Sequence, residues 1–274
     1  ENYLLIGTDA TGNNNNGADY QGSMADFLML VIVDKTENTY SFLQFNRDTM
    51  TEVALIDHNG EGEATANIQL CTAHWYGGNR EQSCENTVKS VKKLLGGIQI
   101  DGYYELNMSE IPKLNNMVDG VTVTLEDDFS KKYPKMKKGA TINLDDEQAY
   151  AYVHDRYGVG DEENTSRMKR QQQYMTGFFK KLQEKVKANP NYANEVFESL
   201  QDVSTTDITI GKISNISNIF ASGTDKGIFE LAGKSKIGQA LGDEIDHMEF
   251  YVNKKAMVST MSELFGIVEQ KNKE

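Results

Sequence analysis

Short apolar runs of strand length alternate in this chain with longer segments that have the spacing of amphipathic helices. Residues 3–6, 27–34 and 39–45 are runs of large apolar side chains, which are typical of buried strands. Residues 80–95 place their apolar positions on one face of a helix, and residues 165–186 form a second, longer helical segment. This interleaved order favours a layered fold of the α/β or α+β class.

The rest of the chain divides in the same way. Residues 27–34 and 39–45 flank a polar tetrapeptide and predict a β-hairpin or two adjacent strands. We predict further strands over residues 100–106, 121–125, 228–231 and 249–252, and helices over residues 65–76, 109–117, 145–154, 192–202, 212–222 and 253–265. We expect a core over residues 1–188, with residues 189–274 adding helices and strands packed on the same domain.

The chain is acidic, with a formal net charge of -13. A protein that binds nucleic acid without sequence preference needs a basic surface, so DNA and RNA are poor partner candidates. An acidic protein that holds a polyanion must gather a few cations in one place or use a divalent metal ion. There is one clear basic run, residues 130–138, and its simplest interpretation is a solvated loop.

The two cysteines, Cys71 and Cys84, leave two alternatives open. In an exported protein they could form one disulfide, and otherwise they are two buried thiols. No Cys-x-x-Cys pair or His/Cys cluster suggests a zinc site.

The amino-terminal end bears on where the protein acts. No stretch approaches the roughly 18 apolar residues of a membrane span, and no signal peptide is visible. The chain begins at Glu1 directly before a strand-like run, so we expect a removed leader or a membrane anchor to precede it.

An arginine and an aspartate, Arg47 and Asp48, are adjacent directly after the predicted strand 39–45. The carboxyl ends of strands in α/β folds commonly form ligand sites, so these opposite charges would lie at the mouth of the sheet. The alternative is an internal salt bridge that holds a loop.

A second group of candidates lies on the predicted helix 165–186. Arg167, Arg170 and Gln171 share one helix face through their spacing. Arginine offers planar, bidentate donors that suit phosphate oxygens, and Arg156 upstream adds another guanidinium. The alternative is an exposed basic helix face.

Two early aspartates, Asp9 and Asp26, lie near the ends of apolar strands. Carboxylates can hold Mg²⁺ together with waters and the phosphates of a substrate, although singly each is more often a turn or capping residue. Aspartates combined with several arginines form the inventory that pyrophosphate transfer needs. Cations and a metal neutralise the leaving phosphate, and a carboxylate deprotonates the attacking hydroxyl.

The order of these residues resembles the LytR-CpsA-Psr family over about residues 2–185. The motifs that carry the resemblance are Gly7-Thr8-Asp9, Ala25-Asp26, Asn46-Arg47-Asp48-Thr49, Asn67, and residues 73–78, 114–123, 144–156 and 166–172. The resemblance implies a central mixed β-sheet sandwiched between helices, with a hydrophobic pocket for a polyprenyl chain. The family's older name, cell-envelope-related transcriptional attenuator, implies regulation, but the chain has no helix-turn-helix signal and the wrong charge for DNA.

The resemblance also implies a function and a location. It implies an enzyme on the extracellular face of a Gram-positive bacterial membrane, anchored by an amino-terminal segment. Such an enzyme transfers a glycopolymer, for example teichoic acid or capsule, from a polyprenyl-pyrophosphate carrier to peptidoglycan with Mg²⁺. A pyrophosphatase side activity is expected as well.

The roles implied by the resemblance fall on residues already singled out. Asp26, Asp48 and Asp9 match metal-associated aspartates, and Asp26, Asp48 and Arg47 match catalytic positions, with Asp26 or Asp48 as the general base. The implied pyrophosphate-binding residues are Arg47, Arg156, Arg167, Arg170, Gln171 and His154.

Three positions depart from the family pattern. Met24, Thr65 and His154 stand where many relatives carry Arg, Lys and Arg. Losing one charge-assisted contact costs roughly 1.5–3 kcal/mol of phosphate binding, and His154 recovers part of this if it is protonated. These departures support an alternative function, a non-catalytic envelope protein that binds polyprenyl phosphate lipids.

Overall fold

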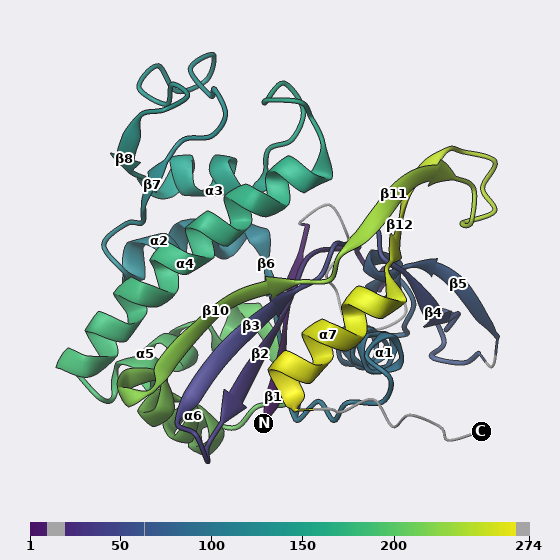
Figure 1. The fold of residues 1–274 in the computed structure, drawn as a ribbon, viewed down its shortest axis with the longest axis horizontal. Coiled ribbons are helices and arrows are strands. Elements are labelled where there is room, and N and C mark those ends of the chain that lie inside the picture. The colour runs from purple at the N-terminus through teal and green to yellow at the C-terminus, as the bar shows by residue number, and fades with distance from the viewer. Residues whose placement is uncertain (10–19, 63, 267–274) are drawn as a thin grey trace. The chain divides into compact units, whose positions relative to one another are not determined.

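The computed structural model describes residues 1–9, 20–62 and 64–266 (Figure 1). The chain divides into two compact units. Unit 1 comprises Glu1–Leu106, Ser204–Ile208 and Asp225–Glu274, and unit 2 comprises Asn107–Val203 and Thr209–Thr224. Both expected segments, 1–188 and 189–274, therefore contribute residues to each unit.

Unit 1 is built on a six-stranded mixed sheet with the strand order β10-β3-β2-β1-β6-β9. The strands are β1 (Asn2–Thr8), β2 (Ala25–Asp34), β3 (Thr39–Gln44), β6 (Gly102–Asn107), β9 (Ser204–Thr206) and β10 (Thr224–Glu230). The pairs β1–β2, β2–β3 and β6–β9 are antiparallel. The hairpin predicted over residues 27–34 and 39–45 is confirmed.

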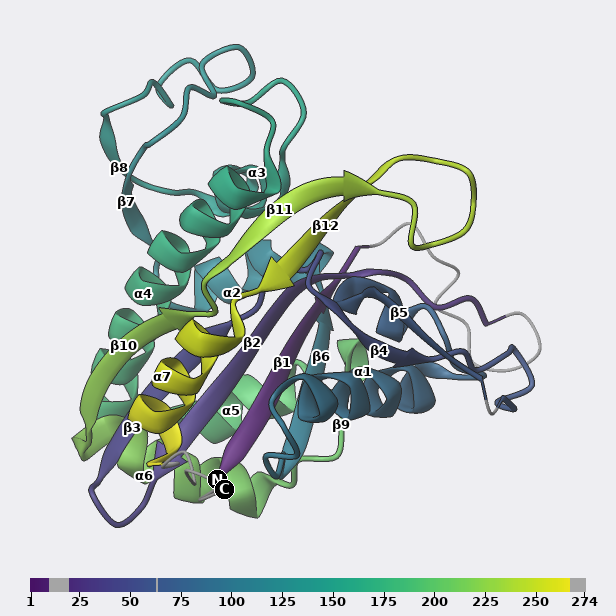
Figure 2. The ribbon, with the colours of Figure 1, turned by 45° about the vertical axis from the view of Figure 1, so that its right-hand side comes forward.

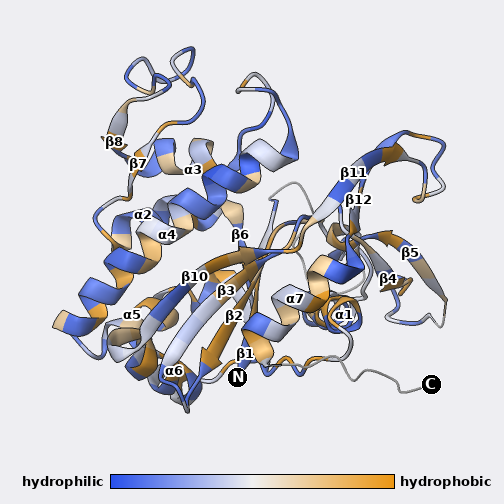
Figure 3. Cartoon of the chain, in the orientation of Figure 1, coloured by the Kyte–Doolittle hydropathy of each residue, from blue (hydrophilic) through white to orange (hydrophobic). Residues whose placement is uncertain are grey.

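One face of this sheet is covered by two helices from distant parts of the chain, α1 (Arg80–Leu94) and α7 (Lys254–Phe265) (Figure 1). Side chains two positions apart, such as Leu28 and Leu30 on β2, point to that face because strand residues alternate. They share a buried cluster with Val91 of α1 and Met261 of α7. Figure 3 shows that β2 is largely apolar along its length.

Unit 1 also contains two small antiparallel hairpins. They are β4 (Met50–Ala54) with β5 (Thr65–Gln69), and β11 (Gly233–Gly238) with β12 (His247–Val252). The helix predicted over residues 65–76 is wrong, because residues 65–69 pair with β4 and only η1 (Leu70–His74) is helical. Cross-strand pairing, in which Thr51 faces Ile68, overrides the helical spacing of the apolar residues.

Unit 2 is mainly helical (Figure 2). Its elements are η2 (Met108–Glu110), α2 (Ile111–Met117), β7 (Thr122–Thr124), β8 (Thr141–Asn143), α3 (Asp146–His154), α4 (Asn164–Ala188), α5 (Tyr192–Ser199), η3 (Gln201–Val203) and α6 (Ile210–Ser222). The helices predicted in this part of the chain are confirmed, with boundaries shifted by a few residues. Tyr152 of α3 and Tyr174 and Phe178 of α4 lie in one buried cluster.

Two expectations about the whole chain can be compared with the structure. Cys71 and Cys84 are free and buried, so the alternative of two buried thiols is the one observed. None of the helices within the described ranges is long and apolar enough to cross a membrane.

A buried ion pair joins α1 to the sheet of unit 1. The Glu105 side chain on β6 is 2% exposed and accepts a hydrogen bond from Arg80 Nη2 at 2.6 Å. Its other carboxylate oxygen accepts from the Thr8 hydroxyl of β1 at 2.7 Å. Removing Arg80 would leave the Glu105 charge buried without a counter-ion, which is strongly destabilising.

We predict that Arg80→Ala lowers the free energy of unfolding by about 3 kcal/mol, because it leaves the buried Glu105 carboxylate without its counter-ion. Urea denaturation measures this loss. Lys93→Ala is the control, since its ion pair with Glu52 joins side chains that are 63% and 47% exposed, and surface pairs contribute less than about 1 kcal/mol. Equal losses in the two variants would contradict the prediction.

Candidate functional site

The candidate site of unit 1 lies where β2 begins and β3 ends. The two strands are antiparallel, with Met29 paired to Gln44. Asp26 lies three positions before Met29, and Arg47 lies three positions after Gln44. The same register therefore places Asp26 opposite Arg47 at one end of the sheet.

The Arg47 guanidinium is held between two aspartates. Its Nη1 donates to Asp26 Oδ1, and its Nε lies 3.6 Å from Asp48 Oδ1. Its Nη2 donates to two sulfur atoms, Met24 Sδ at 2.9 Å and Cys71 Sγ at 3.3 Å. The side chains of Arg47, Asp26 and Asp48 are 18%, 8% and 13% exposed, so water screens these charges only partly.

The charges around Arg47 keep it ionised. Burial lowers the pKa of Arg47, but Cys71, Asp48 and Asp9 raise it by more, so the net pKa lies above its usual value. Asp9, at the end of β1, thus acts electrostatically on the same guanidinium. Burial raises the pKa of the Cys71 thiol, against the opposing effect of Arg47. The cluster therefore combines one fixed cation with several carboxylates.

A tight turn fixes the backbone that carries Arg47 and Asp48. The Asp48 amide donates to the Asn46 side chain at 2.9 Å, and the Thr49 hydroxyl donates to the Asn46 carbonyl at 2.6 Å. From η1, the Cys71 amide donates to the Arg47 carbonyl at 2.9 Å. The sequence of this turn thus orients both charged side chains through local hydrogen bonds.

The unit 2 candidates gather where α4 packs against the carboxyl end of α3. The last carbonyls of a helix have no partner within the helix. Here the Tyr152 carbonyl accepts from Arg170 Nε at 2.9 Å, and the Val153 carbonyl accepts from Gln171 Nε2 at 3.1 Å. Two predicted phosphate-binding residues therefore cap a helix, and a cation at this end also suits the helix dipole.

Arg170 makes several further contacts. Its side chain is 1% exposed, and its Nη1 donates to Asp127 Oδ2 at 2.6 Å. Its Nη2 donates to the Asp155 carbonyl, and its guanidinium lies 5.4 Å from the centre of the Phe129 ring. All three nitrogen atoms of the guanidinium are thus bonded within unit 2.

Arg167 is buried on the same face of α4 as Arg170 and Gln171. Its Nη2 donates to Asn164 Oδ1, one turn earlier, at 2.9 Å. The shared helix face predicted from the spacing is confirmed, but that face is buried, and the alternative of an exposed basic helix face is wrong.

His154 and Arg156 are more accessible than the arginines of α4. His154 stacks on Tyr150 with ring centres 4.7 Å apart, and its Nδ1 lies 3.2 Å from Asp155 Oδ1. That contact is the main cause that lowers the pKa of Asp155. Arg156 lies over the ring of Tyr157 and donates to its hydroxyl at 2.5 Å, and the Tyr157 side chain is highly exposed. Both side chains are partly exposed and can meet a ligand.

The structure brings the candidates together in two groups. Asp26, Arg47 and Asp48 are in contact within unit 1, with Asp9 acting on Arg47 through its charge. His154, Arg156, Arg167, Arg170 and Gln171 lie around the α3–α4 contact of unit 2. That both groups bind one pyrophosphate stays a prediction, as do the metal and catalytic roles.

No group of three or more His, Cys, Asp or Glu side chains that could hold a metal ion is present in the described ranges. Magnesium usually keeps several waters and takes only one or two protein carboxylates together with substrate phosphates. Asp26 and Asp48, which share Arg47, fit that smaller requirement.

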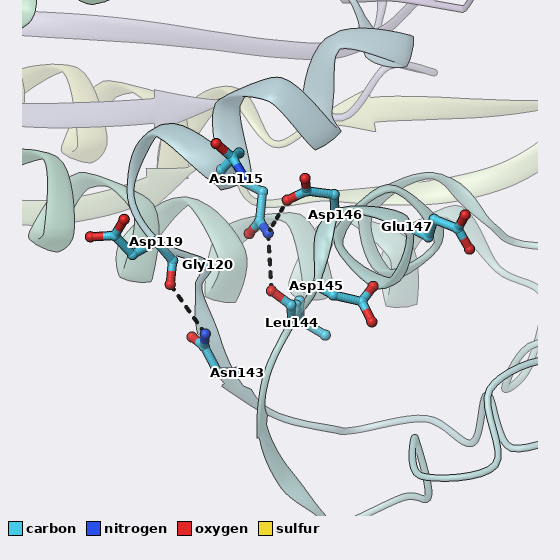
Figure 4. Close-up of a pocket in the computed structure, with 9 residues that line it drawn as sticks. Asn115, Asp119, Gly120, Asn143, Leu144, Asp145, Asp146 and Glu147 are labelled. Carbon is cyan, nitrogen blue, oxygen red and sulfur yellow. Dashed lines mark hydrogen bonds between the residues drawn. The ribbon is translucent and has the colours of Figure 1, made fainter.

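Unit 2 also contains an acidic cavity of about 510 Å³ between α2 and the start of α3 (Figure 4). Asn115 lies inside it and donates to the Leu144 carbonyl at 3.0 Å and to Asp146 Oδ1 at 3.1 Å. The carboxylates in its lining are Asp119, Asp145, Asp146 and Glu147. None of the predicted site residues lines this cavity.

Several partners in these groups were not foreseen from the sequence. The sequence indicates Cys71 only as a disulfide partner or a buried thiol, and Met24 only as a lost positive charge, yet both contact Arg47. Asp127, the counter-ion of Arg170, lies 43 positions away in the chain. No local pattern in the sequence indicates these pairings, because each depends on how distant segments pack.

Comparisons with known proteins connect this chain and its fold to one family. A model of the LytR_cpsA_psr family matches residues 1–265. The polyisoprenyl-teichoic acid–peptidoglycan teichoic acid transferase TagU of Bacillus cereus is 29% identical over 178 residues, which are 65% of this chain and 51% of that protein. The match thus spans about half the length of that curated relative.

Solved structures share the fold. TagV of B. subtilis has a TM-score of 0.70 at 20% identity, covering 97% of both chains. Protein gbs0355 of Streptococcus agalactiae has a TM-score of 0.74 at 21% identity, covering 96% of this chain and 86% of that one. TagT bound to LI-WTA has a TM-score of 0.69 at 20% identity, covering 97% and 89%. The expected central mixed sheet flanked by helices is confirmed, and the polyprenyl pocket stays a prediction.

The burial of Arg170 leads to a prediction about stability. Arg170→Ala should lower the free energy of unfolding by about 3–5 kcal/mol, because it leaves a carboxylate and two carbonyls without their donor. Hydrogen exchange of the α3 and α4 amides measures the loss within unit 2. Lys169→Ala, at the exposed neighbouring position, is the matched control and should change the free energy by less than about 0.5 kcal/mol. Unchanged protection in Arg170→Ala would refute the capping role.

Proposed function

The chain belongs to the LytR-CpsA-Psr family, and on that premise we propose that it is a cell-wall glycopolymer phosphotransferase. It moves a glycan from a polyprenyl-pyrophosphate carrier to peptidoglycan. The Bacillus cereus relative is named as a transferase that acts between polyisoprenyl-linked teichoic acid and peptidoglycan. The kinds of donor and acceptor are taken from that relative.

The observation that carries the proposal is the Arg47 cluster. An arginine held between Asp26 and Asp48 at a strand end combines a phosphate-binding donor with two potential bases in one place. Charge develops on the phosphate oxygens during transfer, and a fixed guanidinium stabilises it without reorganising.

The reaction assigns a role to each group. A hydroxyl of the peptidoglycan acceptor attacks the glycan-bearing phosphorus and forms a new P–O bond. The pyrophosphate P–O bond breaks, and polyprenyl phosphate leaves with the bonding electrons. The proton of the hydroxyl passes to a carboxylate, Asp26 or Asp48. Arg47 neutralises charge on the transferred group.

Magnesium is part of the proposal. Asp26 and Asp48 would hold the ion, with Asp9 close enough to act on the same cluster through its charge. When bound, Mg²⁺ supplies positive charge to the pyrophosphate oxygens and to the leaving phosphate. The few protein ligands fit an ion that takes its remaining ligands from water and substrate.

The unit 2 residues divide by exposure. His154 and Arg156 are partly exposed, and we assign them contact with the pyrophosphate. Arg167, Arg170 and Gln171 are buried, and Arg170 and Gln171 hold the carboxyl end of α3 in place. We assign these buried residues a positioning role, which adds to the direct phosphate contact implied by the resemblance.

The proposed location is the extracellular face of a bacterial membrane, with an amino-terminal anchor outside this chain. The cell-wall acceptor named for the relative supports that location, because peptidoglycan lies outside the membrane.

The alternative is a non-catalytic envelope protein that binds polyprenyl phosphate lipids. Met24 supports it, because a neutral thioether contacts Arg47 where many relatives carry an arginine. Thr65 and His154 point the same way.

We predict Mg²⁺-dependent release of polyprenyl phosphate when the protein is incubated with a polyprenyl-pyrophosphate-linked saccharide and peptidoglycan. Arg47→Ala should lower the rate by about 100-fold or more, as loss of a donor to developing negative charge does. Asp26→Asn and Asp48→Asn should also lower it. Asp34→Asn, at the exposed far end of β2, is the control and should leave the rate unchanged.

Two outcomes would decide against the proposal. Lipid binding without any product in the wild type would favour the non-catalytic alternative. Equal rates in Arg47→Ala and the wild type would show that the Arg47 cluster is not the reacting site.

A further inference from the structure

The basic run of the sequence lies in the connection between β7 and β8 of unit 2 (Figure 1). We call residues 129–138 the basic loop. It contains no Asp or Glu, and all of its lysines are exposed in a chain of net charge -13. The lysines are Lys131, Lys132, Lys135, Lys137 and Lys138.

The basic loop is folded rather than simply solvated. Phe129 and Met136 are 4% and 0% exposed and belong to the core of unit 2. The Phe129 amide donates to the Met136 carbonyl at 2.9 Å, and the Met136 amide donates to the Tyr133 carbonyl at 2.8 Å. Because its apolar side chains point inward, the loop presents its lysines on a fixed backbone.

Most of these charges are not neutralised by the protein. Lys132 Nζ lies 3.5 Å from Asp155 Oδ2. The other four lysines form no ion pair with any of the residues that the structure describes. Glu126 and Asp128 precede the loop and offset part of its charge, whereas Asp127 is paired with Arg170. The loop therefore keeps an excess of positive charge.

The basic loop is joined to the residues proposed to contact the pyrophosphate. Lys132 pairs with Asp155, which lies between His154 and Arg156 in the chain. Beneath the loop, the Arg170 guanidinium lies 5.4 Å from the centre of the Phe129 ring. A chain attached to a pyrophosphate at His154 and Arg156 would thus have the lysines beside it, all within unit 2.

We infer that the basic loop is a subsite for a polyanionic glycan, the charged polymer attached to the pyrophosphate. The inference rests on the proposed function for the position of that pyrophosphate. Lysine is a hydrated point charge on a flexible stem, without the fixed fork of arginine. Such groups suit anions that repeat along a polymer, and they give a neutral glycan no advantage. Because Phe129 and Met136 point inward, they are not available to insert into a membrane.

The test compares two variants that lose the same charge. In one, all five lysines of the basic loop become Gln. In the matched control, five exposed lysines of unit 1 become Gln, namely Lys89, Lys92, Lys93, Lys226 and Lys234. Binding of inorganic polyphosphate, polygalacturonate and neutral dextran is measured for both variants and the wild type.

We expect the wild type to bind the two polyanions at least about tenfold more tightly than dextran, and the loop variant to lose most of that difference. The control should stay within about twofold of the wild type. Added salt should weaken the wild type more steeply than the loop variant, because fewer counter-ions are released when the lysines are absent. Comparison of polyphosphate with polygalacturonate shows whether phosphate or carboxylate is preferred.

Equal binding by the loop variant and the control, or dextran binding as tightly as the polyanions, overturns the inference.

A second arm separates the inference from the proposed function. Geranylgeranyl pyrophosphate with Mg²⁺ should bind equally to the wild type and the loop variant. If the wild type fails to bind geranylgeranyl pyrophosphate, the proposed function is overturned. If the loop variant binds the polyanions as tightly as the wild type does, only the inference is overturned. Phosphatidylglycerol vesicles test the other source of anions. Loop-dependent vesicle binding without loop-dependent polymer binding would make the loop a membrane contact and refute the glycan subsite.

Discussion

The antiparallel register of β2 with β3 is the constraint on which the candidate chemistry of unit 1 depends. It places Asp26 opposite Arg47 beyond the last paired residues, although 21 positions separate them in the chain. A slip by one residue would turn every side chain of β2 to the opposite face of the sheet. Leu28 and Leu30 face the core shared with α1 and α7, and Met29 between them is buried as well, so both faces of β2 are apolar. The pairing of β2 with β3 thus fixes the geometry of the charged cluster at the end of the strands.

The arginines show that residue type and spacing do not separate a ligand contact from a structural one. Arg170 is surrounded by acceptors of its own unit, whereas Arg156 lies against an exposed tyrosine. Phosphate binding is predicted for both from the resemblance to the family. A buried charge is retained only where its partners are complete, and its removal affects folding before chemistry. Lost activity in an Arg170 variant therefore has to be separated from lost structure before it is assigned to catalysis.

The parts of the fold that could be predicted are those with strong periodicity. The strands β1, β2 and β3 are predictable from their apolar runs, and α4 is predictable from its amphipathic pattern, because burial produces both patterns. Short strands are not predictable in this way. The strand β9 pairs with β6 through Tyr104 and Thr206, and no local feature of its three residues indicates that partner. Contacts between distant segments of the site are equally unpredictable. The order of the motifs indicates the candidate residues, but the contact of Cys71 with Arg47 depends on tertiary packing.

Unit 1 is assembled from three separate stretches of chain, and this has a consequence for biosynthesis. The hairpin of β2 and β3 emerges early from the ribosome, but α7, which covers its apolar face, comes from the last part of the chain. Until then the open edge of β3, later paired with β10, is available to other strands. Nascent unit 1 therefore passes through an interval in which it cannot complete its core and is prone to aggregate.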